Sequence, residues 1–238
     1  MEPQTAPELS FVWYEMEHWL WLIAGATSTF LWIRIGKAQR NDQKQQQLGL
    51  IMSLIPAILW IGIALYMVFY DDPFDIGLVL PFHVCYFLNL LMPFMLWRRS
   101  YFLFEISYFM VMGGCIQALI TPDILTTFPD YINIRYFVVH ICLVQSVLYA
   151  IFVFGFRPTW KSFGKSLLWT NIYLLFVICL NALLGTNFMY LKEKPTTTTM
   201  LDLFGEWPWY IIGGEFLAFA IFSLLMLPFM FSRKKESG

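Results

Sequence analysis

Three polar side chains of types that bind or react with substrates lie in an otherwise apolar stretch, residues 80–123. They are His83, Gln117 and Asp123. The basic pair Arg98-Arg99 separates two apolar segments within this stretch, so the second segment should run back beside the first. His83, near the start of one segment, and Gln117, near the end of the other, should therefore lie on the same side of a membrane. The stretch predicts a polar site without naming its substrate.

Later apolar segments carry polar residues at a similar depth. At 1.5 Å per helical residue, His140 and Glu215 both lie about seven residues below the outer surface. Ionisable groups in hydrocarbon cost several kcal/mol unless they face one another or water, so the shared depth predicts one cavity in the outer half of the membrane. We expect His83 and His140 to be catalytic. The predicted substrate-binding residues are Gln117, Asn181, Asn187, Tyr190, Glu215 and Asp123.

Composition defines the class of protein. Hydrophobic residues make up 59% of the 238 residues and charged residues only 13%, against about 25% charged in a soluble domain. The chain is therefore predicted to be an integral membrane protein. Its four cysteines all lie in apolar segments, where a thiol behaves as a small hydrophobe, so no disulfide framework is indicated. They are Cys85, Cys115, Cys142 and Cys179.

Apolar runs long enough to span a bilayer recur along the whole chain, which predicts an all-α bundle of seven transmembrane helices forming one domain, residues 1–238. The connections between the runs are short and polar. The predicted spans are approximately 18–35, 48–70, 77–97, 101–121, 133–156, 165–186 and 208–231.

Charge distribution predicts the orientation. Alternate polar stretches, together with the C-terminal segment, hold 12 of the 15 basic residues, whereas the stretches between them are mainly acidic. Short loops rich in Lys and Arg stay in the cytoplasm, so we expect the N-terminus outside and the C-terminus in the cytoplasm.

Several of these polar residues also have a purely structural interpretation. Gln117 and Asn181 could join helices by hydrogen bonds, which is the commoner role of a lone amide in a membrane. Glu105, near the cytoplasmic end of its segment, could reach water or pair with Arg98 or Arg99. His18, beside two tryptophans at the membrane boundary, is expected to have an interfacial role.

The chain resembles the YwaF-type integral membrane proteins from its second apolar segment to its last. The resemblance rests on LPFHVCYF at 80–87, on FEISYF and GGCIQALITPD within 104–123, on His140, and on NFMYLKEKP and LDLFGEWPWY within 187–210. More distantly, that family is similar to the eukaryotic transmembrane protein 164, a cysteine-dependent acyltransferase that makes polyunsaturated ether phospholipids. The resemblance implies a lipid-directed activity.

The resemblance also implies roles for particular positions. In the eukaryotic relative, a cysteine directly precedes a histidine at the start of the third helix, and a second histidine lies in the fifth. His83 and His140 match the histidines, but Phe82 occupies the cysteine position. Cys85 is nearby, yet two residues along a helix rotate by about 200°, so it should point away from His83 unless the helix is broken after Pro81. We therefore expect the histidines to matter more than any cysteine.

Three classes of function remain open. The first is a lipid acyltransferase or hydrolase with His83 or His140 as general base, and the second is a protein that binds or transports a small solute or lipid headgroup. The third is a zinc-dependent membrane hydrolase using both histidines with Asp123 or Glu215, although no HExxH motif is present. The sequence indicates no cofactor, no resident metal and no nucleic-acid partner. Membrane lipid is the expected partner, and the cell membrane the expected location.

Overall fold

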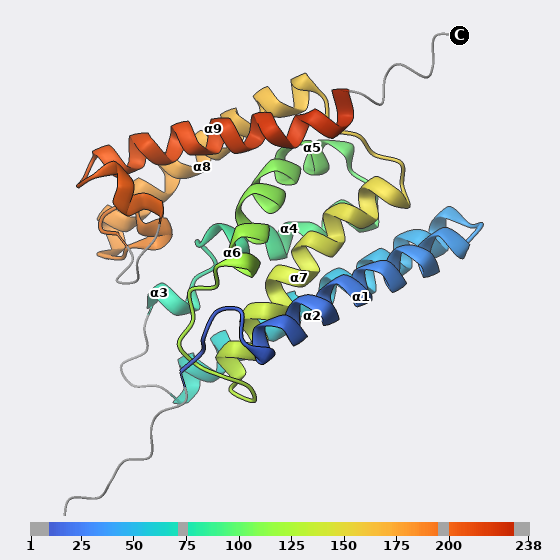
Figure 1. The fold of residues 1–238 in the computed structure, drawn as a ribbon, viewed down its shortest axis with the longest axis horizontal. Helices are drawn as coiled ribbons and strands as arrows, with labels where there is room; N and C mark the ends of the chain where they lie inside the picture. Colours follow the sequence, from blue (N-terminus) through green and yellow to red (C-terminus); the bar gives the residue numbers. More distant parts are fainter. Residues whose placement is uncertain (1–9, 71–75, 195–199, 231–238) are drawn as a thin grey trace, which may run out of the picture.

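The computed structural model describes residues 10–70, 76–194 and 200–230, and all regular structure in these parts of the chain is helical. The longer helices pack into a bundle (Figure 1). Their bounds are α1 Met16–Ala38, α2 Asp42–Tyr70, α4 Val84–Arg98, α5 Tyr101–Met110, α7 Tyr131–Phe152, α8 Trp160–Leu184 and α9 Trp209–Met230. The shorter elements are α3 Ile76–Val79, α6 Ile116–Ile120 and the single turns Phe188–Tyr190 and Met200–Phe204.

Five helical segments are long and apolar enough to cross a membrane. They are Asp42–Tyr70, Tyr101–Ile120, Tyr131–Phe152, Trp160–Leu184 and Trp209–Met230. The protein is therefore an all-helical, multi-pass membrane protein. Helices α1 and α4 lie where the sequence predicts two more spans, but α4 has only 15 residues. The total of seven spans stays a prediction.

Helix α7 forms the centre of the bundle. It packs against α1, α2 and α4, and 72% of its most apolar stretch is buried inside the protein, against 11% for α8. Helices α8 and α9 lie side by side along the opposite edge of the molecule, with α5 between them and α7 (Figure 1). The central helices can therefore hold a site away from lipid, while α8 exposes most of its surface.

The predicted span 77–97 is not one continuous helix. It consists of α3, a break from Leu80 to His83, and then α4. Pro81 lies within the break, and His83 precedes α4 with an extended backbone (φ −69°, ψ 138°). A proline disfavours helical conformation in the residue before it, which is the physical reason for the interruption.

The predicted span 101–121 is continuous but irregular. Between α5 and α6, residues Val111–Cys115 form a turn of π-helix. The turn contains Gly113, whose missing side chain leaves room for Ile221 and Phe222 of α9. One extra residue per turn rotates everything that follows, and this rotation decides which way Cys115 faces.

One end of the bundle carries the connections α1–α2, α4–α5 and α7–α8, which contain Arg40, Arg99 and Arg157, and we call it the basic end. Figure 1 shows the α1–α2 and α7–α8 connections together with the end of α9 at the right of the molecule. The described N-terminal segment starts at the opposite end. This arrangement agrees with the charge pattern, but which end faces the cytoplasm stays a prediction.

A buried acid lies near the basic end. Glu105 of α5 forms an ion pair with Lys165 of α8 and accepts a hydrogen bond from Ser162 at 2.9 Å. The suggested pairing of Glu105 with Arg98 or Arg99 is therefore wrong. The reason is the close packing of α5 on α8, which brings Lys165 nearer than the turn after α4.

Candidate functional site

Cys85 lies where three elements meet, in the first turn of α4. Its thiol lies close to the Cys115 thiol, in the π-helical turn, and to the His140 imidazole on α7. His83 lies close enough to interact with it electrostatically. The first turn of a helix favours negative charge, because its backbone N–H groups are unpaired and the helix dipole is positive there.

His140 is held in one tautomer by the backbone. Its Nδ1–H donates to the Tyr136 carbonyl at 2.7 Å, and a carbonyl can only accept. The proton of a neutral ring is thus fixed on Nδ1, and Nε2 carries a lone pair for the cysteine. The Tyr136 ring packs against the imidazole with the centroids 4.4 Å apart, which restricts its rotation. A base oriented by a third group is the arrangement that activates a nucleophile in covalent catalysis.

His83 precedes α4, because the helix is broken after Pro81, which is the exception allowed for in the sequence analysis. The rotation of about 200° expected within a continuous helix therefore does not apply to His83 and Cys85. His83 Nδ1 accepts from the Met189 amide at 3.4 Å, and its ring contacts Phe188 and Tyr190. The half-buried imidazole therefore joins the cysteine to the segment that follows α8.

Phe82, at the position that resembles the family's cysteine, lies in an apolar cluster. Its ring contacts Phe176 and Phe188, and its carbonyl accepts from the Tyr173 hydroxyl at 3.0 Å. It positions the chain before α4 and carries no reactive group. The only cysteine that we can place beside a histidine in the described residues is Cys85.

Two other predicted residues lie near His83. Tyr190 forms a side-chain hydrogen bond with the exposed Asp123, which follows α6. Burial, and then the Asp123 carboxylate, raise the pKa of the Tyr190 phenol, so that it stays protonated and can donate. Gln117 lies half-buried in α6, six residues before this acid.

Three predicted residues have structural contacts instead. Asn181 accepts from the Phe188 amide at 2.8 Å and donates to its carbonyl at 3.0 Å, which fixes the segment after α8. Asn187 accepts from the amides of Lys192 and Glu193 and shapes the next turn. Glu215 accepts from Asn171 on α8 at 3.2 Å. These contacts explain the three residues without a ligand.

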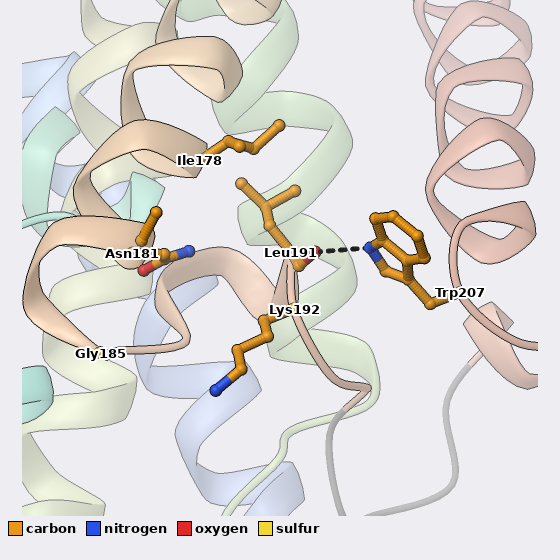
Figure 2. Close-up of a pocket in the computed structure, with 7 residues that line it drawn as sticks. Ile178, Asn181, Gly185, Leu191, Lys192 and Trp207 are labelled. Carbon is orange, nitrogen blue, oxygen red and sulfur yellow. Dashed lines mark hydrogen bonds between the residues drawn. The ribbon is translucent and has the colours of Figure 1, made fainter.

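A groove of about 490 Å³ opens beside Asn181. Figure 2 shows its walls: Ile178 and Asn181 of α8 on one side and Trp207 on the other, with the Trp207 indole donating to the Leu191 carbonyl at 3.3 Å. The Asn181 amide is engaged by Phe188, as described above. The groove is therefore mostly apolar and suits a lipid chain better than a polar solute.

The three histidines have different roles. His18 is fully buried, accepts from the Tyr14 amide at 3.0 Å and donates to the Leu119 carbonyl at 2.8 Å. The segment before α1 folds over His18 and shields it from the surface, and its expected place at the membrane interface stays a prediction. Both of its ring nitrogens are used by the backbone, whereas His140 keeps one nitrogen for a thiol.

Sequence analysis missed Arg135. It is 8% exposed, its guanidinium lies over the Tyr86 ring at 5.2 Å, and its Nε has no hydrogen-bond partner. Among the described residues no carboxylate lies within ion-pair distance of it. It also acts electrostatically on His140. Burying an unneutralised cation within the membrane costs free energy, so an arginine inside an apolar segment is the sequence signal that could have identified Arg135 as a candidate.

The second missed residue is Asn89 of α4. It is fully buried, and neither atom of its amide has a partner. Its position four residues after Cys85 could have drawn attention to it, because residues four apart share a helix face. Within the described part of the chain, no group of three or more His, Cys, Asp or Glu residues could hold a metal ion.

Fold and site define a multi-pass helical membrane protein with a buried Cys–His pair. Comparison with family models gives a match to the TMEM164 family over residues 13–226. The match covers most of the chain, so the chain belongs to the TMEM164 family. No curated protein and no solved structure matches it.

Proposed function

We propose that this protein is a membrane-lipid acyltransferase in which Cys85 is the nucleophile and His140 the general base. The observation that carries this proposal is the contact between the Cys85 thiol and the His140 imidazole, whose tautomer the Tyr136 carbonyl fixes. Membership of the TMEM164 family supports a lipid substrate. The closer affiliation with YwaF-type proteins stays part of this proposal.

The reaction follows from the two groups. His140 Nε2 takes the Cys85 proton while the sulfur attacks the carbonyl carbon of a lipid ester. The tetrahedral intermediate collapses, the carbon–oxygen bond breaks, and the departing alkoxide receives the proton from His140. A lysolipid leaves, and the acyl group stays on Cys85 as a thioester. The hydroxyl of a second lysolipid then attacks the thioester, giving its proton to His140, and the thiol returns.

Neighbouring groups assist these steps. The neighbouring Cys115 thiol can donate to the Cys85 sulfur, and the first turn of α4 stabilises negative charge there as the sulfur attacks. His83 supplies a second imidazole on the side facing Tyr190, where it can bond the polar part of the lipid. If water replaces the second lipid, the same site releases a free fatty acid and acts as a hydrolase.

Arg135 fits the substrate headgroup. A lipid phosphate would satisfy the unpartnered Nε–H and neutralise the guanidinium, and charge-assisted hydrogen bonds of this kind are about twice as strong as neutral ones. Tyr86 holds the guanidinium by a cation–π contact. Tyr190 and Asp123 would face the polar part of the same headgroup.

The experiment uses the purified full chain in detergent, with reductant to keep the four free cysteines reduced. The protein is incubated with phosphatidylcholine bearing a deuterated acyl chain and with an unlabelled lysolipid. Mass spectrometry then follows acyl exchange, free fatty acid and a labelled thioester on the peptide containing Cys85. We expect the thioester in the wild type, its removal by hydroxylamine, and its absence from Cys85→Ser.

Two outcomes would overturn this proposal. Turnover that persists in Cys85→Ser would exclude the thiol mechanism and return the nucleophile to an oxygen group activated by His83 or His140. Absence of acyl exchange and of fatty acid release in the wild type would favour a protein that binds or transports a lipid headgroup without breaking bonds.

We also propose the predicted topology, in which seven helices cross the membrane with the N-terminus outside and the C-terminus in the cytoplasm. It is supported by the cluster of basic connections at one end of the bundle and by α1 and α4 in the predicted places. Single cysteines in a background lacking Cys85, Cys115, Cys142 and Cys179 can be labelled from either side of intact cells. Labelling of both termini from one side would exclude an odd number of spans.

A further inference from the structure

Asn89 is an anomaly within the protein interior. Its exposed fraction is 0%, and both Nδ2 and Oδ1 lack a hydrogen-bond partner. Leaving a buried polar group unpaired lowers the stability of the fold, so packing alone favours an apolar residue of the same size there. A side chain that lowers stability in this way is typical of a functional site.

The position of Asn89 relates it to Cys85. The two residues are four apart in α4 and lie on the same face of that helix, one turn from each other. Side chains of an α-helix tilt toward its N-terminus, so the Asn89 amide extends from its own Cα toward the turn that carries Cys85. No hydrogen bond joins the amide to the sulfur. The amide is therefore free to bond a third group that comes to the sulfur.

We infer that the Asn89 amide is the oxyanion donor of the site, an inference that rests on the acyl transfer proposed above. When the Cys85 sulfur attacks, the carbonyl π electrons move to the oxygen, and Nδ2–H donates to the oxyanion that forms. The electron pair returns to the carbon when the alkoxide leaves. An oxyanion donor must be preorganised and shielded from water, and a fully buried amide on a helix meets both conditions.

Asn133 of α7 shows what a structural asparagine looks like in the same protein. It is also 0% exposed, but its amide donates to Glu17 and to the Thr126 carbonyl, both at 2.8 Å, and accepts from Trp21 at 3.1 Å. The two residues have the same type and the same burial and differ in their partners. Asn133 is therefore a matched control for the same substitution.

The test compares Asn89→Leu with Asn133→Leu. Leucine keeps nearly the same size and shape and removes the amide. The probe is the deuterated phosphatidylcholine used above, and the readouts are the single-turnover rate of thioester formation, the rate of Cys85 alkylation by iodoacetamide, and the melting temperature. Alkylation requires the thiolate but forms no oxyanion, so it separates activation of the nucleophile from stabilisation of the intermediate.

We expect Asn89→Leu to slow thioester formation by about 10²–10³-fold, as loss of one oxyanion donor does in other enzymes. Its alkylation rate should equal that of the wild type, and its melting temperature should be equal or higher. Asn133→Leu should lower the melting temperature, with thioester formation changing only in proportion to the folded fraction. Asn89→Ala provides a second variant without the amide if leucine does not fit.

Three results would overturn the inference. In the first, Asn89→Leu and Asn89→Ala form the thioester at the wild-type rate. This result excludes Asn89 as the oxyanion donor and leaves Cys85 as the proposed nucleophile. In the second, alkylation and thioester formation fall together, which indicates a structural role such as holding an internal water. In the third, the wild type forms no thioester at all, and the proposed function fails with the inference.

Discussion

Two of the polar clusters inside this apolar bundle differ in how fully their groups are paired. Near the basic end, the Glu105 carboxylate has Lys165 on one oxygen and Ser162 on the other. In the cluster around Cys85, the amide of Asn89 and the Nε of Arg135 have no partners, although both residues are buried. The first cluster is complete without a ligand.

The difference indicates where function lies. Burying polar groups in a membrane protein is costly, and the cost is offset when the groups satisfy one another. The Glu105 cluster joins α5 to α8 and contributes to the stability of the fold. The cluster around Cys85 holds a thiol, an imidazole and unpaired donors, and its unpaired groups lower that stability. We expect substitutions in the first cluster to change the melting temperature and those in the second to change turnover.

Among variants that keep the Cys85 nucleophile, the largest effect on turnover should come from His140→Ala. Loss of a general base reduces rates by about 10²–10⁴-fold, equivalent to roughly 2.7–5.5 kcal/mol in the barrier. Acyl exchange measured by mass spectrometry, beside the melting temperature, checks this expectation. His18→Ala is the matched control, because its ring is bonded only to backbone groups and its loss should mainly lower the melting temperature. Equal turnover of wild type and His140→Ala would contradict the comparison.

Glu105→Ala should give the largest loss of stability of the variants compared. Removal of one partner of a buried ion pair costs about 3–5 kcal/mol, but Lys165 is 44% exposed and can reach water, so we expect about 1–3 kcal/mol. Thermal unfolding followed by tryptophan fluorescence measures the change. Acyl exchange per folded molecule should stay at the wild-type level. A selective loss of turnover would place the Glu105 cluster in the reaction.

Arg135→Gln should have an intermediate effect that depends on the lipid. Loss of the guanidinium should raise KM for a phospholipid donor by about tenfold, equivalent to roughly 1.4 kcal/mol, with little change in kcat. The same variant tested with a diacylglycerol donor, which has no phosphate, should match the wild type. An equal loss with both donors would assign Arg135 to folding instead.

The smallest loss of stability should follow removal of the ion pair between Arg99 and Asp42, in which 2.6 Å separate Nη1 of Arg99 and Oδ2 of Asp42. The Asp42 side chain is 77% exposed, so water screens the pair. Asp42→Asn should lower the free energy of unfolding by about 0–1 kcal/mol, and less in high salt. Differential scanning fluorimetry at two salt concentrations checks it. If Asp42→Asn lowered the free energy of unfolding as much as Glu105→Ala, an exposed ion pair would stabilise the fold as much as a buried one, which would contradict the comparison.

The amino-acid sequence determined that this protein folds in a membrane, and it determined the positions of most helices. Long apolar runs in a chain with few charges leave no soluble alternative, because a backbone in lipid must satisfy its own hydrogen bonds. Five of the predicted segments correspond to helices long and apolar enough to cross a membrane. His83 and His140 also followed from sequence, because a histidine is rare in an apolar run.

Only the tertiary structure decided what His140 faces. The start of α4 at Val84 and the π-helical turn before Ile116 each change the direction of a cysteine, and neither is visible in hydrophobic periodicity. Cys85 and His140 then meet because α4 packs on α7. Whether a polar residue such as Asn89 is paired depends on neighbours contributed by other helices, so its significance appears only when the whole bundle is assembled.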